Sequence, residues 1–513
     1  MRNQGLGSWP ARRARRTPHR TALVQDDGDA PLTYDALHRR TARLAHALRA
    51  RGVRHGDRIA YLGPNHHTFL ETLFASGMLG AVFVPLNTRL TAAELGHQVR
   101  DCGPAVLVHA PSHRGEAAAL APEARPAVVL ETGPRYETWL AEAVDDPLDE
   151  PVRADDLCLI MYTSGTTGRP KGAMLTHANL IWNAVNVLID HDLLATERAL
   201  VTAPLFHAAG LGMIALPVLL KGGTCVLAGS FDPGRTLETI ARHRITFMFG
   251  VPTMYELMCR HPAWQTADLS TLRLLTCGGA PVPARLIRSC LERGLTLRQG
   301  YGMTEAGPGV LSLAAEHTAA KAGAAGVPHF FTDVKVVRAD LTEAAPGETG
   351  EIVVRGPHVG PGYWGLPDAT ADAFTDGWLR TGDAARADAD GHLVIADRIK
   401  DMYISGGENV CPAEVEEALL DHPDIADCAV IGVPDETWGE TGLALVVPRP
   451  GAGIDPERIP PFLARTLARY KIPRSVLVVD ELPRTASGKL LKDRLRARYA
   501  PAPVPGRPGP RPS

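Results

Sequence analysis

The most concentrated chemical signal in the chain is a loop rich in glycine and hydroxyl side chains, directly after the apolar run Leu157–Tyr162. Its glycines allow tight turns that direct backbone N–H groups to one point. Hydroxyl donors and one lysine complete a set that suits a polyphosphate, although the spacing does not fit a Walker A motif. The alternative is an ordinary flexible surface loop. The residues assigned to phosphate binding are Thr163, Ser164, Gly165, Thr166, Thr167, Gly168 and Lys171.

A second cluster of chemically useful residues is the pentapeptide Tyr301–Glu305, which follows the strand-like run Leu295–Gln299. An aromatic face, a hydroxyl and a carboxylate in one short loop are groups that can hold a nucleotide with Mg²⁺. The alternative is a tight turn that carries a glutamate by chance. Upstream, Cys277–Pro281 ends another apolar run with two glycines, which permit either close approach of a ligand or a plain strand-to-helix turn.

Short apolar runs alternate with helical stretches through most of the chain, and this order indicates an α/β fold with parallel sheets. The segment His67–Leu79 is expected to be a helix between two strands. The expected strands are Arg58–Leu62, Ala81–Pro85, Leu157–Tyr162, Ala199–Ala203, Thr224–Leu227, Thr246–Phe249 and Leu272–Cys277.

The C-terminal part has a different pattern. Glu351–Arg355 and His392–Ala396 predict antiparallel strands of a smaller sheet. After a short charged segment, the expected order of one helix and two strands indicates a compact α+β unit of roughly 100 residues. These three segments are Ala413–Leu420, Cys428–Val433 and Leu443–Val447. The tail Pro501–Ser513 is rich in proline and glycine and is expected to be disordered.

Composition excludes several classes of protein. The 513 residues carry a net charge of -3, so there is no electrostatic argument for a nucleic-acid partner. The apolar run Ala208–Leu220 is short and contains Pro217, which argues against a membrane span. No apolar segment follows the arginines near the N-terminus, which argues against a secretory signal. The eight cysteines are scattered without a C-x-x-C pair, which argues against a zinc or redox motif and favours the cytoplasm.

Taken together, these motifs resemble the adenylate-forming superfamily, which includes acyl-CoA synthetases, amino-acid adenylation domains and luciferases. The motifs follow in the family's order from Leu32 to Leu491, nearly the whole chain. The resemblance implies a large N-terminal domain of doubly wound α/β sheets plus a small β-sheet, and a smaller, mobile α+β C-terminal domain. The implied boundaries are 1–396 for the AMP-binding domain, 397–400 for a hinge, 401–500 for the mobile domain and 501–513 for the tail.

The resemblance also implies roles for individual residues. Thr304 would contact the α-phosphate, Glu305 would hold Mg²⁺, and His207 would lie against the acyl carboxylate. Lys489 would bind that carboxylate and neutralise charge at the α-phosphate, and Lys400 would be the hinge. Taken alone, Lys489 is more simply a mobile surface residue. The implied adenine and ribose contacts are Gly279, Ala280, Pro281, Gly300, Tyr301, Gly302, Met303, Asp383 and Arg398.

Two further groups of residues concern coenzyme A and the acid. Ser405, Gly406, Gly407 and Glu408 resemble the segment that faces coenzyme A in the family's CoA ligases. The residues that line the implied acyl pocket are small or apolar, which suits a fatty acyl chain or an apolar aryl acid better than a dicarboxylate. Its residues are Phe206, Gly210, Val251, Gly278 and Gly307. An amino acid is disfavoured, because no aspartate follows Phe206 to pair with the substrate ammonium.

The predicted activity is ATP-dependent conversion of a carboxylic acid, with a fatty acid favoured, to an acyl adenylate and then to acyl-CoA. The alternatives are an aryl-acid CoA ligase and an adenylate-former that transfers its acyl group to a carrier protein or amine. A non-catalytic nucleotide sensor is disfavoured, because Glu305, Lys489 and the phosphate loop are all present. ATP, Mg²⁺ and coenzyme A are expected, in a cytoplasmic monomer or homodimer. The arginines of Arg12–Arg20 leave open weak peripheral attachment to the inner membrane surface.

Overall fold

The computed structural model describes residues 2–499 except 27, 29, 147, 164–169, 281, 399–400, 406–407, 436–437, 468 and 486–489. The chain forms two compact units. The first contains Met1–Lys335 and Val353–Thr381, and the second contains Val336–Ile352 and Gly382–Ser513. The division falls within three strands rather than in a linker. The hinge predicted at 397–400 therefore stays a prediction, and Lys400 itself lies outside the described residues.

The first unit contains a large, mainly parallel sheet. Among the described residues its strands follow the order β15–β14–β13–β12–β11–β9–β10–β1–β2. The central strands are parallel, and β2, β14 and β15 are antiparallel additions at the two ends. The bounds are β1 Thr21–Gln25, β2 Leu32–Thr33, β9 Arg198–Val201, β10 Thr224–Leu227, β11 Phe247–Gly250, β12 Leu274–Cys277, β13 Leu297–Gly302, β14 Gly309–Ser312 and β15 Val327–Pro328.

A second large sheet of the same unit has the order β18–β8–β7–β4–β3–β5–β6. Its strands β3 to β7 are parallel, while β7 and β8 form an antiparallel hairpin that β18 extends. The bounds are β3 Arg58–Leu62, β4 Val82–Pro85, β5 Val106–His109, β6 Val128–Glu131, β7 Leu157–Thr163, β8 Lys171–Thr176 and β18 Gly362–Tyr363.

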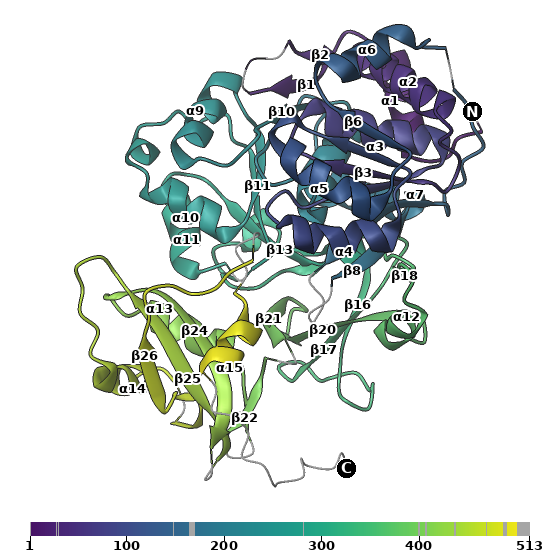
Figure 1. The fold of residues 1–513 in the computed structure, drawn as a ribbon. Coiled ribbons are helices and arrows are strands. Elements are labelled where there is room, and N and C mark those ends of the chain that lie inside the picture. The colour runs from purple at the N-terminus through teal and green to yellow at the C-terminus, as the bar shows by residue number, and fades with distance from the viewer. Residues whose placement is uncertain are drawn as a thin grey trace. The chain divides into compact units, whose positions relative to one another are not determined.

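Helices cover both faces of the large parallel sheet. On β11 and β12, alternate residues enter two separate cores, as expected for strands buried on both faces. One core is formed with α9, α10 and α11, which Figure 1 shows as a teal group, and the other with α3, α7 and α8. The helices of this unit are α1 Trp9–Arg16, α2 Tyr34–Ala50, α3 His67–Leu79, α4 Ala92–Cys102, α5 Arg114–Ala124, α6 Pro134–Glu142, α7 His177–Asp190, α8 Leu216–Lys221, α9 Pro233–His243, α10 Pro252–Arg260, α11 Ala284–Leu291 and α12 Pro367–Ala373.

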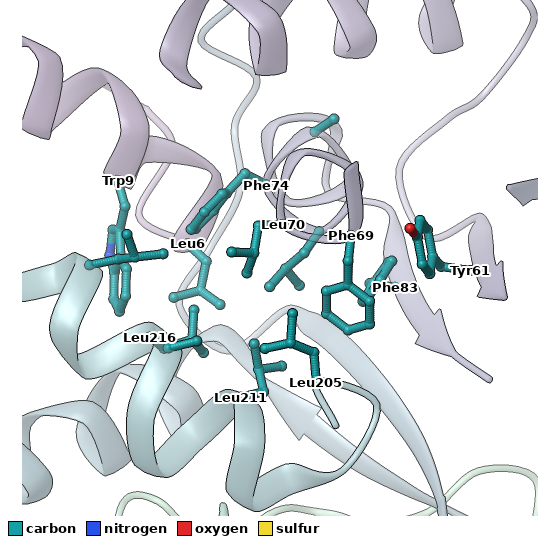
Figure 2. Close-up of a cluster of buried hydrophobic side chains, with 14 of the residues drawn as sticks. Leu6, Trp9, Tyr61, Phe69, Leu70, Phe74, Phe83, Leu205, Leu211 and Leu216 are labelled. Carbon is teal, nitrogen blue, oxygen red and sulfur yellow. The ribbon is translucent and has the colours of Figure 1, made fainter. Parts of the chain in front are cut away.

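The main core joins the two large sheets through α3. This helix is apolar on nearly all sides, and its residues from Thr68 to Leu79 are all buried. Figure 2 shows Phe69, Leu70 and Phe74 of α3 among buried side chains from other elements of the first unit. Tyr61 and Phe83 come from the second sheet, and the others are Leu6, Trp9, Leu205, Leu211 and Leu216. This core fixes the segment that leads into the predicted acyl pocket.

Two smaller sheets follow. One has the order β16–β17–β20–β19, with β21 paired to β20, and the other has the order β23–β22–β25–β24, with β26 paired to β25. Their bounds are β16 Asp333–Val337, β17 Thr349–Arg355, β19 Phe374–Thr375, β20 Trp378–Ala387, β21 Leu393–Arg398, β22 Tyr403–Ser405, β23 Glu408–Val410, β24 Ile425–Asp435, β25 Gly439–Pro448 and β26 Ser475–Val478. The helices with the last sheet are α13 Pro412–Leu420, α14 Ile459–Leu463 and α15 Lys492–Tyr499.

The predicted fold class is confirmed: parallel α/β sheets, a small antiparallel sheet and a smaller α+β unit are all present. The expected strands occur with ends shifted by a few residues, the usual uncertainty at element boundaries. Within the part of the chain that the structure describes, we find no helix with the length and apolar character needed to cross a bilayer.

Candidate active site

Several predicted site residues lie outside the described residues, and nothing structural is said of them. They are Ser164, Gly165, Thr166, Thr167, Gly168, Pro281, Lys400, Gly406, Gly407 and Lys489. Two others, Arg398 at the end of β21 and Glu408 at the start of β23, have side chains outside the description.

The strands around the predicted phosphate loop form a β-hairpin. In this hairpin Thr163 ends β7 and pairs with Lys171 at the start of β8. The hydroxyl of Thr163 donates a weak hydrogen bond to the carbonyl oxygen of Lys171 at 3.4 Å. The phosphate loop is therefore the connection of an antiparallel hairpin, and both ends of that loop are fixed by backbone pairing.

Lys171, Glu305 and Tyr363 meet beside this hairpin, and we call these three residues the nucleotide corner. Strand β18 pairs with β8, which places Tyr363 opposite Ala173. The Tyr363 hydroxyl donates to Oε1 of Glu305 at 2.9 Å, and Nζ of Lys171 lies 5.1 Å from the centroid of the Tyr363 ring. Burial and the nearby Glu305 charge raise the pKa of Tyr363, so its hydroxyl stays protonated and keeps donating.

Glu305 is also fixed through its backbone. Its carbonyl oxygen accepts a hydrogen bond from the Gly360 amide at 2.8 Å. Because Tyr363 occupies one carboxylate oxygen, the second is the atom that can serve a divalent cation, which prefers carboxylate ligands. The residues here therefore fit the Mg²⁺ that the family uses. The sequence analysis missed Tyr363; the turn Gly360-Pro361-Gly362 before it was the only local signal.

The remaining predicted nucleotide contacts lie where the parallel sheet ends. Tyr301 and Gly302 belong to β13, which pairs there with antiparallel β14, and Met303 donates to Pro308 O at 3.0 Å. A Cβ atom on Gly302 would lie 1.7 Å from Pro308 O, so glycine is required. The neighbouring strands also end here, leading into Phe206, Val251, Gly278, Gly279 and Ala280. Ligands of open α/β sheets bind at this carboxyl edge.

His207 follows β9 and precedes a π-helix at Gly210–Ala215. Its ring lies 4.7 Å from that of Phe206, and its buried Nε2 has no hydrogen-bond partner among the described residues. Burial, with a smaller contribution from the charge of Arg89, lowers the pKa of His207 to about 4. The imidazole is therefore neutral at pH 7. Asn65, which the sequence analysis missed, holds the preceding segment by accepting from the Leu205 amide at 2.8 Å.

We call the surface formed by Gly212, Gly307 and Gly309 the acyl side. A Cβ on Gly307 would lie 2.6 Å from His358 O, and one on Gly212 would lie 2.5 Å from Pro308 Cδ. Asn183 of α7 connects two of these glycines: its Nδ2 donates to Gly212 O at 2.8 Å, and its Oδ1 accepts from the Gly309 amide at 2.9 Å. Asn183 was missed, although its side chain is fully buried.

The position of Asn183 carried a signal that sequence analysis could have used. Asn179, Asn183 and Asn186 recur at helical spacing along α7 and are all buried. Asn179 donates to the Pro357 and Val359 carbonyls, and Asn186 bonds the Phe331 amide and the Thr332 hydroxyl. A stripe of buried amides on one helix face is unusual, because each must be satisfied by hydrogen bonds. This stripe holds four segments around the acyl side, namely those at Gly212, Gly309, Phe331–Thr332 and Pro357–Val359.

Asp383 and Ser405 belong to the second unit and are described there. Asp383 lies on β20 opposite Arg398 of β21. Ser405 is buried and pairs with Glu408 across the β22–β23 hairpin, and it also lies opposite Gly439 of β25. The described site residues of the first unit thus lie at the carboxyl edge of the parallel sheet and on the β7–β8 hairpin of the second sheet, whereas Asp383 and Ser405 belong to the second unit.

Comparison with known proteins now identifies the family. The AMP-binding enzyme family matches residues 10–364, and the AMP-binding enzyme C-terminal domain matches residues 414–489. The chain is 58% identical over 499 residues to a feruloyl-CoA synthase of Amycolatopsis sp, covering 97% of this chain and 100% of that protein. It is 43% identical to an indoleacetate–CoA ligase of Aromatoleum aromaticum, covering 96% and 98%.

Solved structures agree with this result. The ATP-bound crystal structure of MatB from Rhodopseudomonas palustris has a TM-score of 0.90 and 33% identity, and the match covers 96% of this chain and 99% of that one. The resemblance inferred from the motifs, the predicted class of enzyme and the predicted use of ATP and coenzyme A are confirmed. The chain belongs to the AMP-binding enzyme family and is an acid–CoA ligase that uses ATP, forms AMP and proceeds through an acyl adenylate.

Proposed function

We propose that this ligase activates an aryl acid of the hydroxycinnamate type, such as ferulate, and not the fatty acid that the sequence motifs favoured. The observation that carries the proposal is the 58% identity to feruloyl-CoA synthase over 97% of the chain. The indoleacetate–CoA ligase, at 43%, bears the name of another aryl acid. The aryl-acid alternative therefore has better support than the fatty-acid prediction.

Glycines of the acyl side and of the neighbouring strand ends suit a flat, rigid substrate. Gly278, Gly300 and Gly309 present backbone in place of side chains, and a Cβ on Gly278 would lie 3.2 Å from Gly300 O and 3.7 Å from the Phe249 ring. Glycine backbone allows a planar ring to approach closely, and apolar neighbours favour its burial. Phe249 itself is buried at the end of β11.

The first half-reaction is attack of the acid carboxylate on the α-phosphorus of ATP, with pyrophosphate leaving. Lys171 and the hairpin loop would bind the phosphates, Thr304 the α-phosphate, and Tyr301 the adenine ring. Glu305 would hold Mg²⁺ through the carboxylate oxygen that Tyr363 leaves open; the bound ion offsets the charge of the phosphates. Neutral His207 would contact the acid carboxylate without adding charge.

The second half-reaction is attack of the coenzyme A thiol on the acyl adenylate, which releases AMP. Lys489 would serve the first half-reaction and then withdraw as the second unit turns about Lys400. The backbone of 405–408 would then face coenzyme A. One hinge that serves two half-reactions is a gated domain motion.

ATP–pyrophosphate exchange over a panel of acids tests the substrate class. The panel should contain 4-hydroxycinnamates, indole-3-acetate, and medium- and long-chain fatty acids, and mass spectrometry should then identify the product with and without coenzyme A. We expect the highest kcat/KM for hydroxycinnamates, with an acyl-CoA product. A highest kcat/KM for a fatty acid would overturn the proposal. Exchange without an acyl-CoA product would favour transfer to a carrier protein or amine instead.

A further inference from the structure

A buried histidine lies behind the acyl side. His329 follows strand β15 directly, and its backbone amide donates to Val310 O at 3.0 Å, which brings it beside the start of β14. The residue is 1% exposed. A Cβ atom on Gly309 would lie 3.1 Å from Nε2 of His329, 3.1 Å from Oδ1 of Asn183 and 3.2 Å from the sulfur of Met213. Nε2 of His329 therefore lies next to the backbone of Gly309, one of the three glycines of the acyl side.

The two ring nitrogens of His329 have different partners. Nδ1 forms a close hydrogen bond with a carboxylate oxygen of Asp190, the last residue of α7. Nε2 is buried and has no hydrogen-bond partner among the described residues. A buried nitrogen left without a partner costs about 1–3 kcal/mol, so a native site usually supplies one. The ligand of the site is the natural candidate for that partner.

The groups around His329 hold the ring in place. Arg298 donates to the Asp190 carbonyl oxygen at 2.9 Å, which anchors the end of α7. The His191 ring stands edge-on to the His329 ring at 6.1 Å. Asn183 already bonds Gly212 and Gly309, so its polar atoms are engaged. Among the atoms that surround the Cβ position of Gly309, Nε2 of His329 is thus the nitrogen that has no hydrogen-bond partner among the described residues.

The geometry of α7 relates this nitrogen to the reacting end of the substrate. The helix begins directly after β8, the strand of the nucleotide corner, and ends at Asp190. A helix of this length spans roughly 20 Å. Asn183, near its middle, touches Gly212 and Gly309, and Asp190 holds His329 at its far end. A substrate whose carboxylate lies near His207 and Thr304 would thus extend its ring towards His329.

We propose that His329 is a specificity-determining residue, whose Nε2 forms a hydrogen bond with the ring hydroxyl of a hydroxyaryl acid. The inference rests on the proposed function and extends it to the substituent recognised. In the tautomer that donates Nδ1–H to Asp190, a neutral imidazole has an acceptor at Nε2, and a phenol hydroxyl is a donor. Gly309 has no side chain that would stand between this hydroxyl and the nitrogen.

The test compares three acids in the full-length enzyme: 4-hydroxy-3-methoxycinnamate, 3-methoxycinnamate and 3,4-dimethoxycinnamate. For each acid, kcat/KM is measured by ATP–pyrophosphate exchange with the wild type, His329→Leu and His329→Gln. In the wild type the hydroxylated acid should be preferred. His329→Leu should reduce that preference about tenfold or more, since a site built for a hydroxyl rejects analogues without it. The kcat/KM of His329→Leu for 3-methoxycinnamate should differ from that of the wild type by less than about twofold.

Two variants separate recognition from folding. His329→Gln keeps a hydrogen-bonding group and should retain most of the preference even if the leucine variant folds poorly. His109→Leu makes the same change at a buried histidine of β5, whose Nδ1 lies 3.0 Å from Ala110 O. It should lower thermal stability and leave the ratio of kcat/KM values unchanged.

The outcomes distinguish the two proposals. If the wild type activates none of the three cinnamates, the proposed function fails. If it activates them but His329→Leu and His329→Gln both keep the wild-type preference for the hydroxylated acid, the role of His329 is overturned and the proposed function stands. Equal losses of kcat/KM for all three acids in His329→Leu would show a structural role only and would also overturn the inference.

Discussion

The nucleotide corner and the acyl side of this site are built in different ways. Lys171, Glu305 and Tyr363 are only partly buried. Backbone pairing between β8 and β18 positions Lys171 and Tyr363, and a backbone hydrogen bond from Gly360 holds Glu305. On the acyl side, Asn183 and His329 are almost completely buried, and glycines replace side chains around them. The partly solvated charges of the nucleotide corner can bind the nucleotide whichever acid is activated, whereas each buried polar atom needs its own hydrogen-bond partner. A buried atom without a partner on the acyl side therefore indicates which group the substrate provides.

The largest expected effect concerns the charge supplied to the α-phosphate. We expect Lys489→Ala to lower the rate of adenylate formation about 10²–10³-fold, because a positioned charge at the reacting group stabilises the transition state. Formation of the thioester from supplied acyl adenylate should change little. Pyrophosphate exchange and a single-turnover reaction of acyl adenylate with coenzyme A measure the two halves.

The control for this experiment is Lys492→Ala. Lys492 is a neighbouring lysine whose Nζ lies 2.9 Å from Glu416, so its removal should alter stability and spare both half-reactions. Equal loss of both half-reactions in Lys489→Ala would contradict the assignment of Lys489 to the first half alone.

Glu305→Gln tests the carboxylate of the nucleotide corner. The amide can still accept from Tyr363 but carries no charge. We therefore expect kcat/KM for ATP to fall about 10²-fold, and the Mg²⁺ concentration needed for half-maximal activity to rise. A titration of pyrophosphate exchange with Mg²⁺ measures this. Glu71→Gln is the matched control, because Glu71 also accepts from a tyrosine, Tyr136, in the buried core. An unchanged Mg²⁺ titration in Glu305→Gln would remove Glu305 from the metal site.

The same comparison explains what sequence analysis could find. Glycine, hydroxyl and charged residues are clustered in short motifs at the nucleotide corner, so Lys171 and Glu305 could be predicted with the α/β fold around them. Tyr363 comes from a strand about 190 residues beyond β8 and was found only when β18 was seen to pair with β8. Asn183 lies in α7 and His329 follows the edge strand β15, and the roles of both depend on contacts between distant segments. The spacing of the α7 asparagines indicates a polar helix face, but local spacing does not indicate which distant segments that face contacts.

Asn183→Leu tests the acyl side itself. The change leaves the Gly212 carbonyl and the Gly309 amide without their partner, so we expect the free energy of unfolding to fall by on the order of 3 kcal/mol. The KM for the acid should also rise, while the KM for ATP should not. Thermal or urea unfolding and steady-state kinetics measure these effects. Asn186→Leu, one turn along α7, should lose similar stability with a smaller change in the KM for the acid.

The smallest expected effect returns to the nucleotide corner. Tyr363→Phe removes the hydroxyl that donates to Glu305 but keeps the ring 5.1 Å from Lys171. One hydrogen bond contributes about 0.5–1.5 kcal/mol, so kcat should fall between about twofold and tenfold, with the Mg²⁺ requirement raised. Tyr136→Phe removes the corresponding hydrogen bond to Glu71, at 2.6 Å, and should lower stability without changing kcat. If both variants changed only stability, Tyr363 would support the fold and not the orientation of Glu305, and the nucleotide corner would depend on backbone pairing alone.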